Sequence, residues 1–354
     1  MGLFYIFFYR IKNFFYLFKK SFFKGIFFNL KFKRNKNSII SFKKNFEEEL
    51  SIQCIDFDEK LLQKNLKPFM GQSLSFQMIK KRKVEIFNNL LTIINNLFPF
   101  RIKIGLEIEF YTKEINQTLF KNLNINNIIN EMGIGQKEIQ TNPYIDMNLL
   151  VDEYEKIKTI LKDANFDAAP FDDDCGSALQ INLSIDDGKN LFARNDDGKD
   201  SNLLFNCVAG LLNNINNNLL LYISDASCLA RYDVERNKNI KNKGKYPAPT
   251  FISWGINNRT SAVRIPTPKN FNDYFTEDKE NRRIEFRVPS AKADIYLVLI
   301  GVLTSVIDGI RNNLYPIEKT SYDVLEKNES LEKIKCDFDE LQDIFYINED
   351  VLFF

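Results

Sequence analysis

The sequence predicts a mixed α+β or α/β fold for the part of the chain that follows residue 100. Two patterns carry this prediction: short segments in which every second residue is apolar, and longer segments whose apolar residues recur at helical spacing. The chain has 354 residues, of which 44% are hydrophobic, so one large domain or two ordinary ones can bury a sizeable core.

The expected elements follow one another in a clear order. A first helix is expected over residues 78–97, because Pro99 stops a helix by removing a backbone donor. The polar, Lys- and Asn-rich segment 233–246 is expected to be an exposed, mobile loop. Strands are expected over 101–111, 178–185, 250–256, 259–265 and 283–288, and further helices over 147–163, 201–222, 292–312 and 322–345.

The strand 101–111, RIKIGLEIEFY, places two carboxylates on one face. Its even-numbered residues, from Ile102 to Phe110, are all apolar, whereas Glu107 and Glu109 lie on the opposite face because a strand has a period of two. The two acidic side chains would stand about 6–7 Å apart. Unpartnered carboxylates repel each other, so a cation beside them is the natural neutralising partner.

Three later strands repeat this separation of apolar and polar faces, and none of them contains Lys. A solvated face of an antiparallel sheet would explain any one of these strands. For all four together, carboxylates that suit Mg²⁺ beside arginines that suit phosphate oxygens favour a nucleotide-phosphate site. The polar faces carry Gln180, Asn182 and Ser184 in 178–185, Arg264 in 259–265, and Arg283, Glu285 and Arg287 in 283–288.

Two glycine-containing turns accompany these strands. In residues 131–138, EMGIGQKE, two glycines between Glu131 and Glu138 permit a tight turn that could bring both acids to one cation. By itself this pattern also fits an ordinary surface turn. A second turn, CGSA at 175–178, leads into the next strand, and the acidic run 172–174 before it fits either a third metal site or a solvated loop.

The composition excludes several functional classes. The chain has no histidine, which excludes Ser-His-Asp and Cys-His catalysis and histidine-bound zinc. Its five cysteines form no CxxC pair and are expected to be reduced thiols of a cytoplasmic protein. Residues 1–46 carry eleven Lys or Arg and no Asp or Glu, which leaves 37 basic and 47 acidic residues in the rest. That acidic remainder argues against a nucleic-acid partner.

The basic segment 1–46 is also rich in aromatic residues, with 13 of the 33 Phe. It has no uncharged stretch long enough for a membrane-spanning helix. Two interpretations stay open: a basic amphipathic segment that lies on an anionic membrane surface, which would make the protein peripheral to a membrane, and a poorly ordered extension. Residues 47–100 are expected to form a short, partly helical N-terminal region.

Taken in order, five motifs resemble the catalytic domain of glutamine synthetases and related glutamate–amine ligases. They are GLEIEFY, EMGIGQKE, GSALQINLSIDDGKNLF, PAPTFISWGINNRTSAVRIP and RRIEFRVP, and they cover about residues 101–312. The resemblance implies an α+β fold with a curved antiparallel sheet backed by helices, which makes residues 101–354 a glutamine-synthetase-like catalytic domain. It also implies an enzyme that uses ATP to phosphorylate the γ-carboxylate of glutamate, after which an amine displaces phosphate.

The resemblance assigns a role to each polar residue of these motifs. By motif position, two Mg²⁺ or Mn²⁺ ions would be held by Glu109, Glu131 and Glu138, nearer the amino acid, and by Glu107, Gln180 and Glu285, between the ATP phosphates. The nucleotide phosphates would be contacted by Arg259, Arg264, Arg283, Asn182 and Ser184. The glutamate or the transferring phosphoryl group would be held by Arg231 and Arg287, with Arg264 on the phosphates and Gly176 beside the amino acid.

The sequence departs from the family pattern at positions for the metal, the phosphates and the amine. Gln180 and Asn182 replace two histidines, and Pro247 replaces a flap glutamate, so that position cannot accept a proton. A glutamine oxygen can still bind Mg²⁺. The small N-terminal domain of the family is not recognisable in residues 47–100, so the ring assembly of relatives is not carried over and a homo-oligomer stays an open alternative.

Two hypotheses about function therefore remain. The first is an ATP-dependent carboxylate–amine ligase that joins glutamate or a similar amino acid to an amine other than ammonia, with Asp233 or Glu235 replacing the lost base. The second is a catalytically inactive homologue that binds nucleotide or glutamate, or that serves as a scaffold.

Overall fold

The computed structural model describes residues 75–194, 198–267 and 280–345, all of which belong to the compact unit Asp58–Phe354. The predicted basic segment 1–46 and the first part of the segment 47–100 lie outside these residues. Within the described ranges, no helix is long and apolar enough to cross a membrane.

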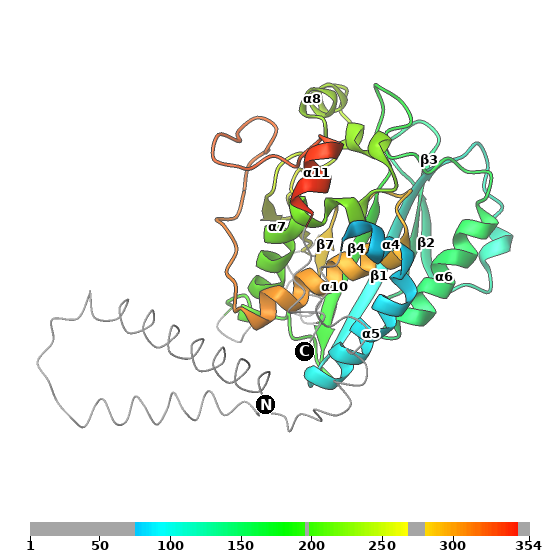
Figure 1. The fold of residues 1–354 in the computed structure, drawn as a ribbon. Coiled ribbons are helices and arrows are strands. Elements are labelled where there is room, and N and C mark those ends of the chain that lie inside the picture. The colour runs from blue at the N-terminus through cyan, green and yellow to red at the C-terminus, as the bar shows by residue number, and fades with distance from the viewer. Residues whose placement is uncertain (1–74, 195–197, 268–279, 346–354) are drawn as a thin grey trace, which may run out of the picture. The chain divides into compact units, whose positions relative to one another are not determined.

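A seven-stranded sheet with the order β2-β3-β1-β4-β7-β6-β5 forms the centre of this unit (Figure 1). Neighbouring strands pair antiparallel except β5 and β6, which run parallel. The α+β prediction is therefore confirmed, and the antiparallel sheet is confirmed for every pair but one. The strands are β1 (Arg101–Tyr111), β2 (Ile125–Asn130), β3 (Gln136–Thr141), β4 (Leu179–Asp186), β5 (Trp254–Ile256), β6 (Val263–Ile265) and β7 (Ile284–Phe286).

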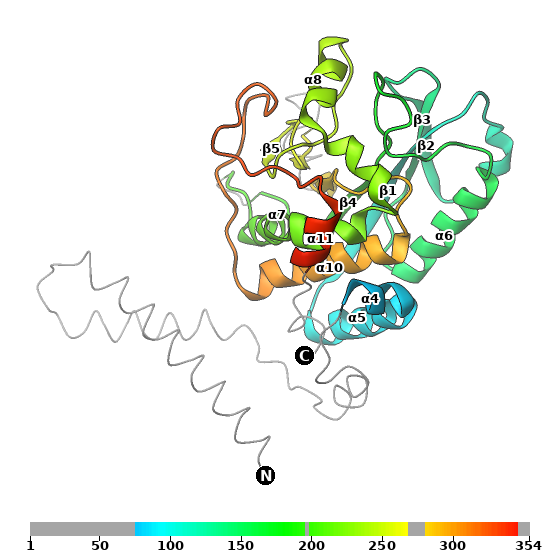
Figure 2. The same cartoon turned by 45° about the horizontal axis from the view of Figure 1, so that its top comes forward.

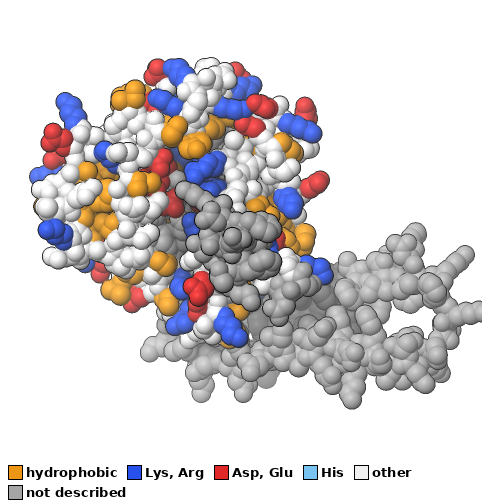
Figure 3. All heavy atoms as spheres, turned by 180° about the vertical axis from the view of Figure 1, so that it is seen from behind, with side chains coloured by type: hydrophobic (Ala, Val, Ile, Leu, Met, Phe, Trp, Pro, Cys, Tyr) orange, Lys and Arg blue, Asp and Glu red, His pale blue; other side chains and the backbone are white. Residues whose placement is uncertain are grey.

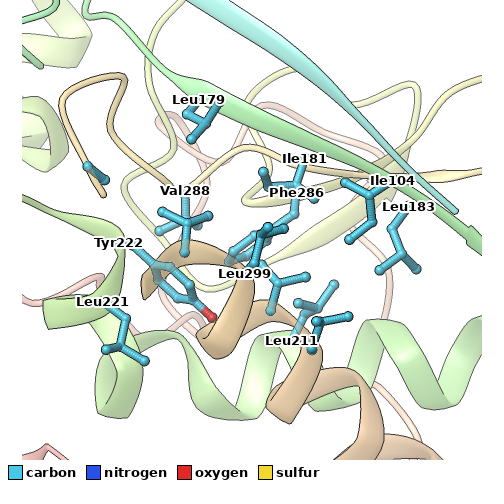
Figure 4. Packing of buried hydrophobic residues seen from close by; sticks show 14 of the residues in the cluster. Ile104, Leu179, Ile181, Leu183, Leu211, Leu221, Tyr222, Phe286, Val288 and Leu299 are labelled. Atoms are coloured by element: carbon cyan, nitrogen blue, oxygen red, sulfur yellow. The ribbon is translucent and has the colours of Figure 1, made fainter. Parts of the chain in front are cut away.

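Helices cover one face of this sheet. Figures 1 and 2 place α7 (Asn202–Tyr222) and α10 (Ile295–Arg311) side by side, with α5 (Lys83–Leu97) next to α10. The close-up in Figure 4 shows Leu211 of α7 and Leu299 of α10 under Ile181 and other apolar side chains of the sheet. The even-numbered residues of β1 supply part of this core, and each is at most 5% exposed.

The remaining helices connect the strands and border the core. The first turn of α6 is stabilised by Asp146, whose side chain accepts hydrogen bonds from two backbone N–H groups, and Asp294 does the same for α10. The predicted helix 78–97 is present but is broken at Arg82 into two helices. The remaining helices are α4 (Phe76–Lys81), α6 (Met147–Ile160), α8 (Val234–Asn242), α11 (Phe338–Ile344) and the 3₁₀ helices η1 (Gln117–Phe120) and η2 (Ala226–Tyr232).

Some predictions about single elements are wrong. Segment 233–246 is not an exposed loop, because it contains α8, whose Asn237 and Ile240 are fully buried. Of the predicted helix 322–345, only Phe338–Ile344 is helical. The expected strands 250–256 and 259–265 shorten to three residues each, and the β2–β3 hairpin was not predicted.

Candidate active site

The face of the sheet opposite the helices carries the polar residues. In the pairing of β1 with β3, Glu109 lies opposite Glu138 and Glu107 lies opposite Gln140. In the pairing of β1 with β4, Glu107 also lies opposite Gln180. The strand register therefore gathers acids from two neighbouring strands, and it places the predicted pair of β1 beside the predicted amide of β4.

Amide groups donate hydrogen bonds to both acids of β1. Gln180 Nε2 donates to Glu109 Oε1 at 2.7 Å, and the backbone N–H of Ala178 donates to Glu109 Oε2 at 2.8 Å. Asn182 Nδ2 donates to Glu107 Oε1 at 3.0 Å. These bonds satisfy carboxylates that are partly buried.

Arginines from neighbouring elements complete the polar face. Arg264 Nη1 donates to Glu285 Oε2 at 2.8 Å, and Arg287 Nε lies 3.3 Å from Glu285 Oε1. Arg231, from η2, donates to the backbone carbonyls of Val288 at 2.9 Å and of Arg287 at 3.1 Å. Glu285 thus has two basic partners, and Arg231 is held in place by the main chain.

The turn between β2 and β3 is joined to the same site by one side chain. Gln136 is only 3% exposed. Its Oε1 accepts the backbone N–H of Gly133 at 3.0 Å, and its Nε2 donates to the carbonyl of Gly176 at 3.1 Å and to Glu109 Oε2 at 3.4 Å. One carboxamide therefore connects both predicted glycine turns to β1.

A cavity of about 720 Å³ opens between these elements. Two predicted site residues do not line it: Asn182 contacts Glu107 instead, and Ser184 lies farther along β4, opposite Lys103. The other twelve line one wall or another, and they are Glu107, Glu109, Glu131, Glu138, Gly176, Gln180, Arg231, Arg259, Arg264, Arg283, Glu285 and Arg287.

Burial and neighbouring negative charges raise the pKa values of four acids that line the cavity. Burial, followed by the charge of Glu285, raises the pKa of Glu107 to about 7. Burial and the neighbouring acids raise the pKa of Glu138 to about 10. The pKa values of Glu109 and Glu131 are also raised, mainly by burial. Acids that resist ionisation in this way form a cluster that a cation would stabilise.

The donor set of the cavity fits a hard divalent cation. Among the residues that the structure describes, no three acids or cysteines are already arranged as a metal-binding group. However, Oε1 of Gln180 is buried and has no hydrogen-bond partner. An amide oxygen is a ligand that Mg²⁺ accepts, and the carboxylates beside it bond to N–H groups that a cation could replace.

The two acids considered as a replacement base lie outside the cavity. Asp233 caps α8 by accepting the backbone N–H of Arg236 at 2.7 Å. Glu235 is exposed and pairs with Lys238 at 2.9 Å. Neither side chain lines the cavity, so the geometry does not support the suggestion that they replace the flap glutamate.

Sequence reasoning missed several residues that line the cavity. Gln136 and Gln140 belong to β3, where the period of two places them on the same face as Glu138. That signal was present in the motif GQKE. Met132 and Tyr246 also line the cavity, and the guanidinium of Arg259 lies 4.8 Å from the centre of the Tyr246 ring. No periodic pattern marks these two, because both lie in loops.

The family model described as "Glutamine synthetase, catalytic domain" matches residues 59–341. The chain is 30% identical over 165 residues to gamma-glutamylputrescine synthetase PuuA of Escherichia coli (strain K12), and 28% identical over 213 residues to glutamine synthetase of Clostridium saccharobutylicum. Those matches cover 46% and 57% of this chain but 31% and 44% of the relatives, so the chain matches less than half the length of either protein.

A solved structure titled "GmaS/ADP complex-Conformation 1" has a similar fold. It superimposes with a TM-score of 0.59 and 16% sequence identity, over 76% of this chain and 70% of that one. At this identity the likeness concerns the arrangement of helices and strands.

Proposed function

This chain belongs to the family of the glutamine synthetase catalytic domain, and on that premise we propose that it is an ATP-dependent ligase that joins glutamate, or a similar amino acid, to an amine. The observation that carries the proposal is one cavity lined by both acids and arginines. Acids suit divalent cations and arginines suit phosphate oxygens, so one site can bind a metal–nucleotide complex and direct phosphoryl transfer.

Two Mg²⁺ or Mn²⁺ ions are proposed as the resident cations. When bound, such ions neutralise negative charge on the phosphates and on the amino-acid carboxylate. The chain has no histidine, and every proposed ligand supplies oxygen, which suits these hard cations. The proposed ligands are Glu109, Glu131 and Glu138 for one ion and Glu107, Gln180 and Glu285 for the other.

In the proposed first step, a γ-carboxylate oxygen of glutamate forms a bond to the γ-phosphorus of ATP, and the bond between that phosphorus and ADP breaks. Arg259 and Arg264 would bind phosphate oxygens. Arg231 and Arg287 would bind the amino-acid carboxylate or the transferring phosphoryl group, where charge develops. Arg264 and Arg287 would exchange their bonds with Glu285 for bonds with substrate oxygens.

In the proposed second step, the amine nitrogen forms a bond to the γ-carbonyl carbon, the bond from that carbon to the phosphate oxygen breaks, and the proton lost by the nitrogen leaves with the phosphate. Pro247 lines the cavity and brings no group that could accept a proton. We therefore propose that the amine enters as the free base, and that it is an amine other than ammonia because Pro247 stands where the family carries its flap glutamate. The name of the Escherichia coli relative, a gamma-glutamylputrescine synthetase, specifies such an acceptor for that protein.

The experiment that tests this function measures Mg²⁺-dependent ADP release from ATP and glutamate, with hydroxylamine and a panel of primary amines. We expect release that depends on the amine and that falls about a hundredfold or more in Glu109→Ala, because the variant loses a proposed metal ligand. Glu155→Ala, an exposed acid of α6 outside the cavity, serves as the matched control and should keep full activity.

The second candidate is a homologue that binds nucleotide or glutamate without turnover. The pairing of Glu285 with two arginines favours it, since those bonds must break before either arginine meets a substrate. Mg²⁺-dependent binding of ATP to folded protein, without ADP release for any amine, would select this candidate over the ligase.

A further inference from the structure

Asp174 is the buried member of the acidic run 172–174, and the site described above does not use it. Only 6% of the residue is exposed. Its Oδ2 accepts the backbone N–H of Ile134 at 3.0 Å, and its Oδ1 accepts the backbone N–H of Cys175 at 2.7 Å and lies 2.7 Å from Lys245 Nζ. One carboxylate thus joins three segments that are far apart in the sequence.

Each of these three segments supplies residues that line the cavity, although Asp174 and Lys245 themselves do not. Met132 lies in the turn that contains Ile134. Gly176, the residue predicted to lie beside the amino acid, follows two positions after Asp174. Tyr246 directly follows Lys245, and its carbonyl oxygen lies 3.7 Å from the sulfur of Cys175.

We propose that Asp174 and Lys245 are positioning residues that hold the three loops, each of which lines the cavity, in the arrangement that binds the amino-acid substrate. The carboxylate is the centre of this junction, and the ammonium group keeps it there. This inference rests on the proposed function for its substrate, but the structural role of the junction can be tested without any turnover.

The ion pair between Asp174 and Lys245 is buried enough to hold the loops together, whereas the neighbouring pair is exposed. The side chains of Asp174 and Lys245 are 9% and 18% exposed, so removal of the cation would leave a carboxylate poorly solvated. The pair Asp173–Lys243 lies beside it at 2.8 Å, but its side chains are 74% and 47% exposed. An exposed pair contributes little to stability, so this second pair is a natural control.

The neighbouring helix α8 holds the third segment from the other side. Asn237 is fully buried, and its Oδ1 accepts the backbone N–H of Ala248 at 2.7 Å. Arg236 donates to the carbonyl of Asp174 at 2.7 Å. The segment that carries Tyr246 is therefore fixed at both ends, and Lys245 is the end that reaches the other two loops.

The first experiment follows hydrogen exchange in the full chain for Lys245→Met and for the control Lys243→Met. We expect the Ile134 amide to exchange about tenfold faster in Lys245→Met, because its acceptor turns toward water when the cation is lost. Lys243→Met should match the unmodified protein, Lys245→Arg should restore most of the protection, and α10 should exchange equally in all of them. Equal exchange at Ile134 in the two Met variants would overturn the proposal.

The second experiment measures ADP release at varied glutamate concentration. We expect Lys245→Met to raise KM for glutamate by about tenfold and to leave kcat within about twofold, because the proposed metal ligands and arginines are untouched. A fall in kcat at unchanged KM would overturn the positioning role. Absence of ADP release in the unmodified protein would refute the ligase function alone, because the exchange experiment still decides the junction.

Discussion

At the scale of single residues, carboxamides give the cavity its character. Gln180, Asn182 and Gln136 each donate to an acid of β1. A carboxamide can donate from its nitrogen while its oxygen is offered to a cation, which a carboxylate or a lysine cannot do. The chain has no histidine, and every proposed metal ligand supplies oxygen, which favours Mg²⁺ or Mn²⁺ over Zn²⁺.

Among these three carboxamides, Gln136 is the one whose replacement gives the clearest test of their role. We expect Gln136→Ala to lower kcat/KM by about tenfold to a hundredfold, because Glu109 and the Gly176 carbonyl lose a shared donor in a buried position. Kinetics of ADP release check this, with Gln140→Ala as the control, since Gln140 donates only to Glu138 among the acids. An equal fall in kcat/KM in both variants would contradict a special role for the bonds from Gln136 to Glu109 and Gly176.

At the scale of elements, the polar composition of residues 233–246 led to the prediction of a loop where the structure has helix α8. Helix α8, VERNKNIKN, has three Asn and only two buried residues, Asn237 and Ile240. Asp233 caps its first turn, and Asn237 bonds to three backbone groups. The Asp233 cap is a local signal, whereas the burial of Ile240 and the bond from Ala248 depend on packing against other segments, which the periodicity of α8 does not display.

The contact between α7 and α10 depends on two glycines. A Cβ added to Gly309 would overlap the carbonyl oxygen of Asn206 and lie 3.0 Å from the Cα of Gly210. We expect Gly309→Ala to destabilise the protein by about 1–3 kcal/mol, because the helices must separate, although alanine favours the helix itself. Chemical denaturation measures this, and Gly105→Ala, whose Cβ would meet nothing closer than 3.5 Å, should cost less. A smaller cost for Gly309→Ala than for Gly105→Ala would contradict the tight crossing.

At the scale of the whole molecule, the charged side chains of the surface are solvated, whereas those of the cavity are mostly buried or half-buried. Acidic and basic side chains are intermixed on the face seen in Figure 3. Acids and arginines also line the cavity together, but the pKa values of four of its five acids are raised, for Glu107, Glu109, Glu131 and Glu138, all chiefly by burial. Burial and the charges of neighbouring acids make ionisation of these groups costly, so a bound cation should stabilise the folded chain.

Thermal unfolding with and without Mg²⁺ tests this coupling. At a Mg²⁺ concentration one hundred times its dissociation constant, the folded state gains about 2.7 kcal/mol, which should raise the melting temperature by a few degrees. Glu138→Gln should lose most of that rise, because it removes a proposed ligand, while the surface variant Glu155→Gln should keep it. An equal rise in both variants would place the cation outside this cavity.

The sequence by itself determined which strands form the site and which faces they present. The acids of β1, the amides of β4 and the charged residues of β7 all follow from a period of two, which is a local property of the chain. The same local patterns carried the family resemblance, and the family model matches residues 59–341.

Only the tertiary structure decided what those side chains meet. The bonds from Gln180 to Glu109 and from Lys245 to Asp174 each join residues 71 positions apart. Such contacts arise when the chain closes on itself, so no local pattern encodes them. For that reason Asp174 looked like part of a solvated acidic run in the sequence, whereas in the folded protein it is buried at the junction of three loops.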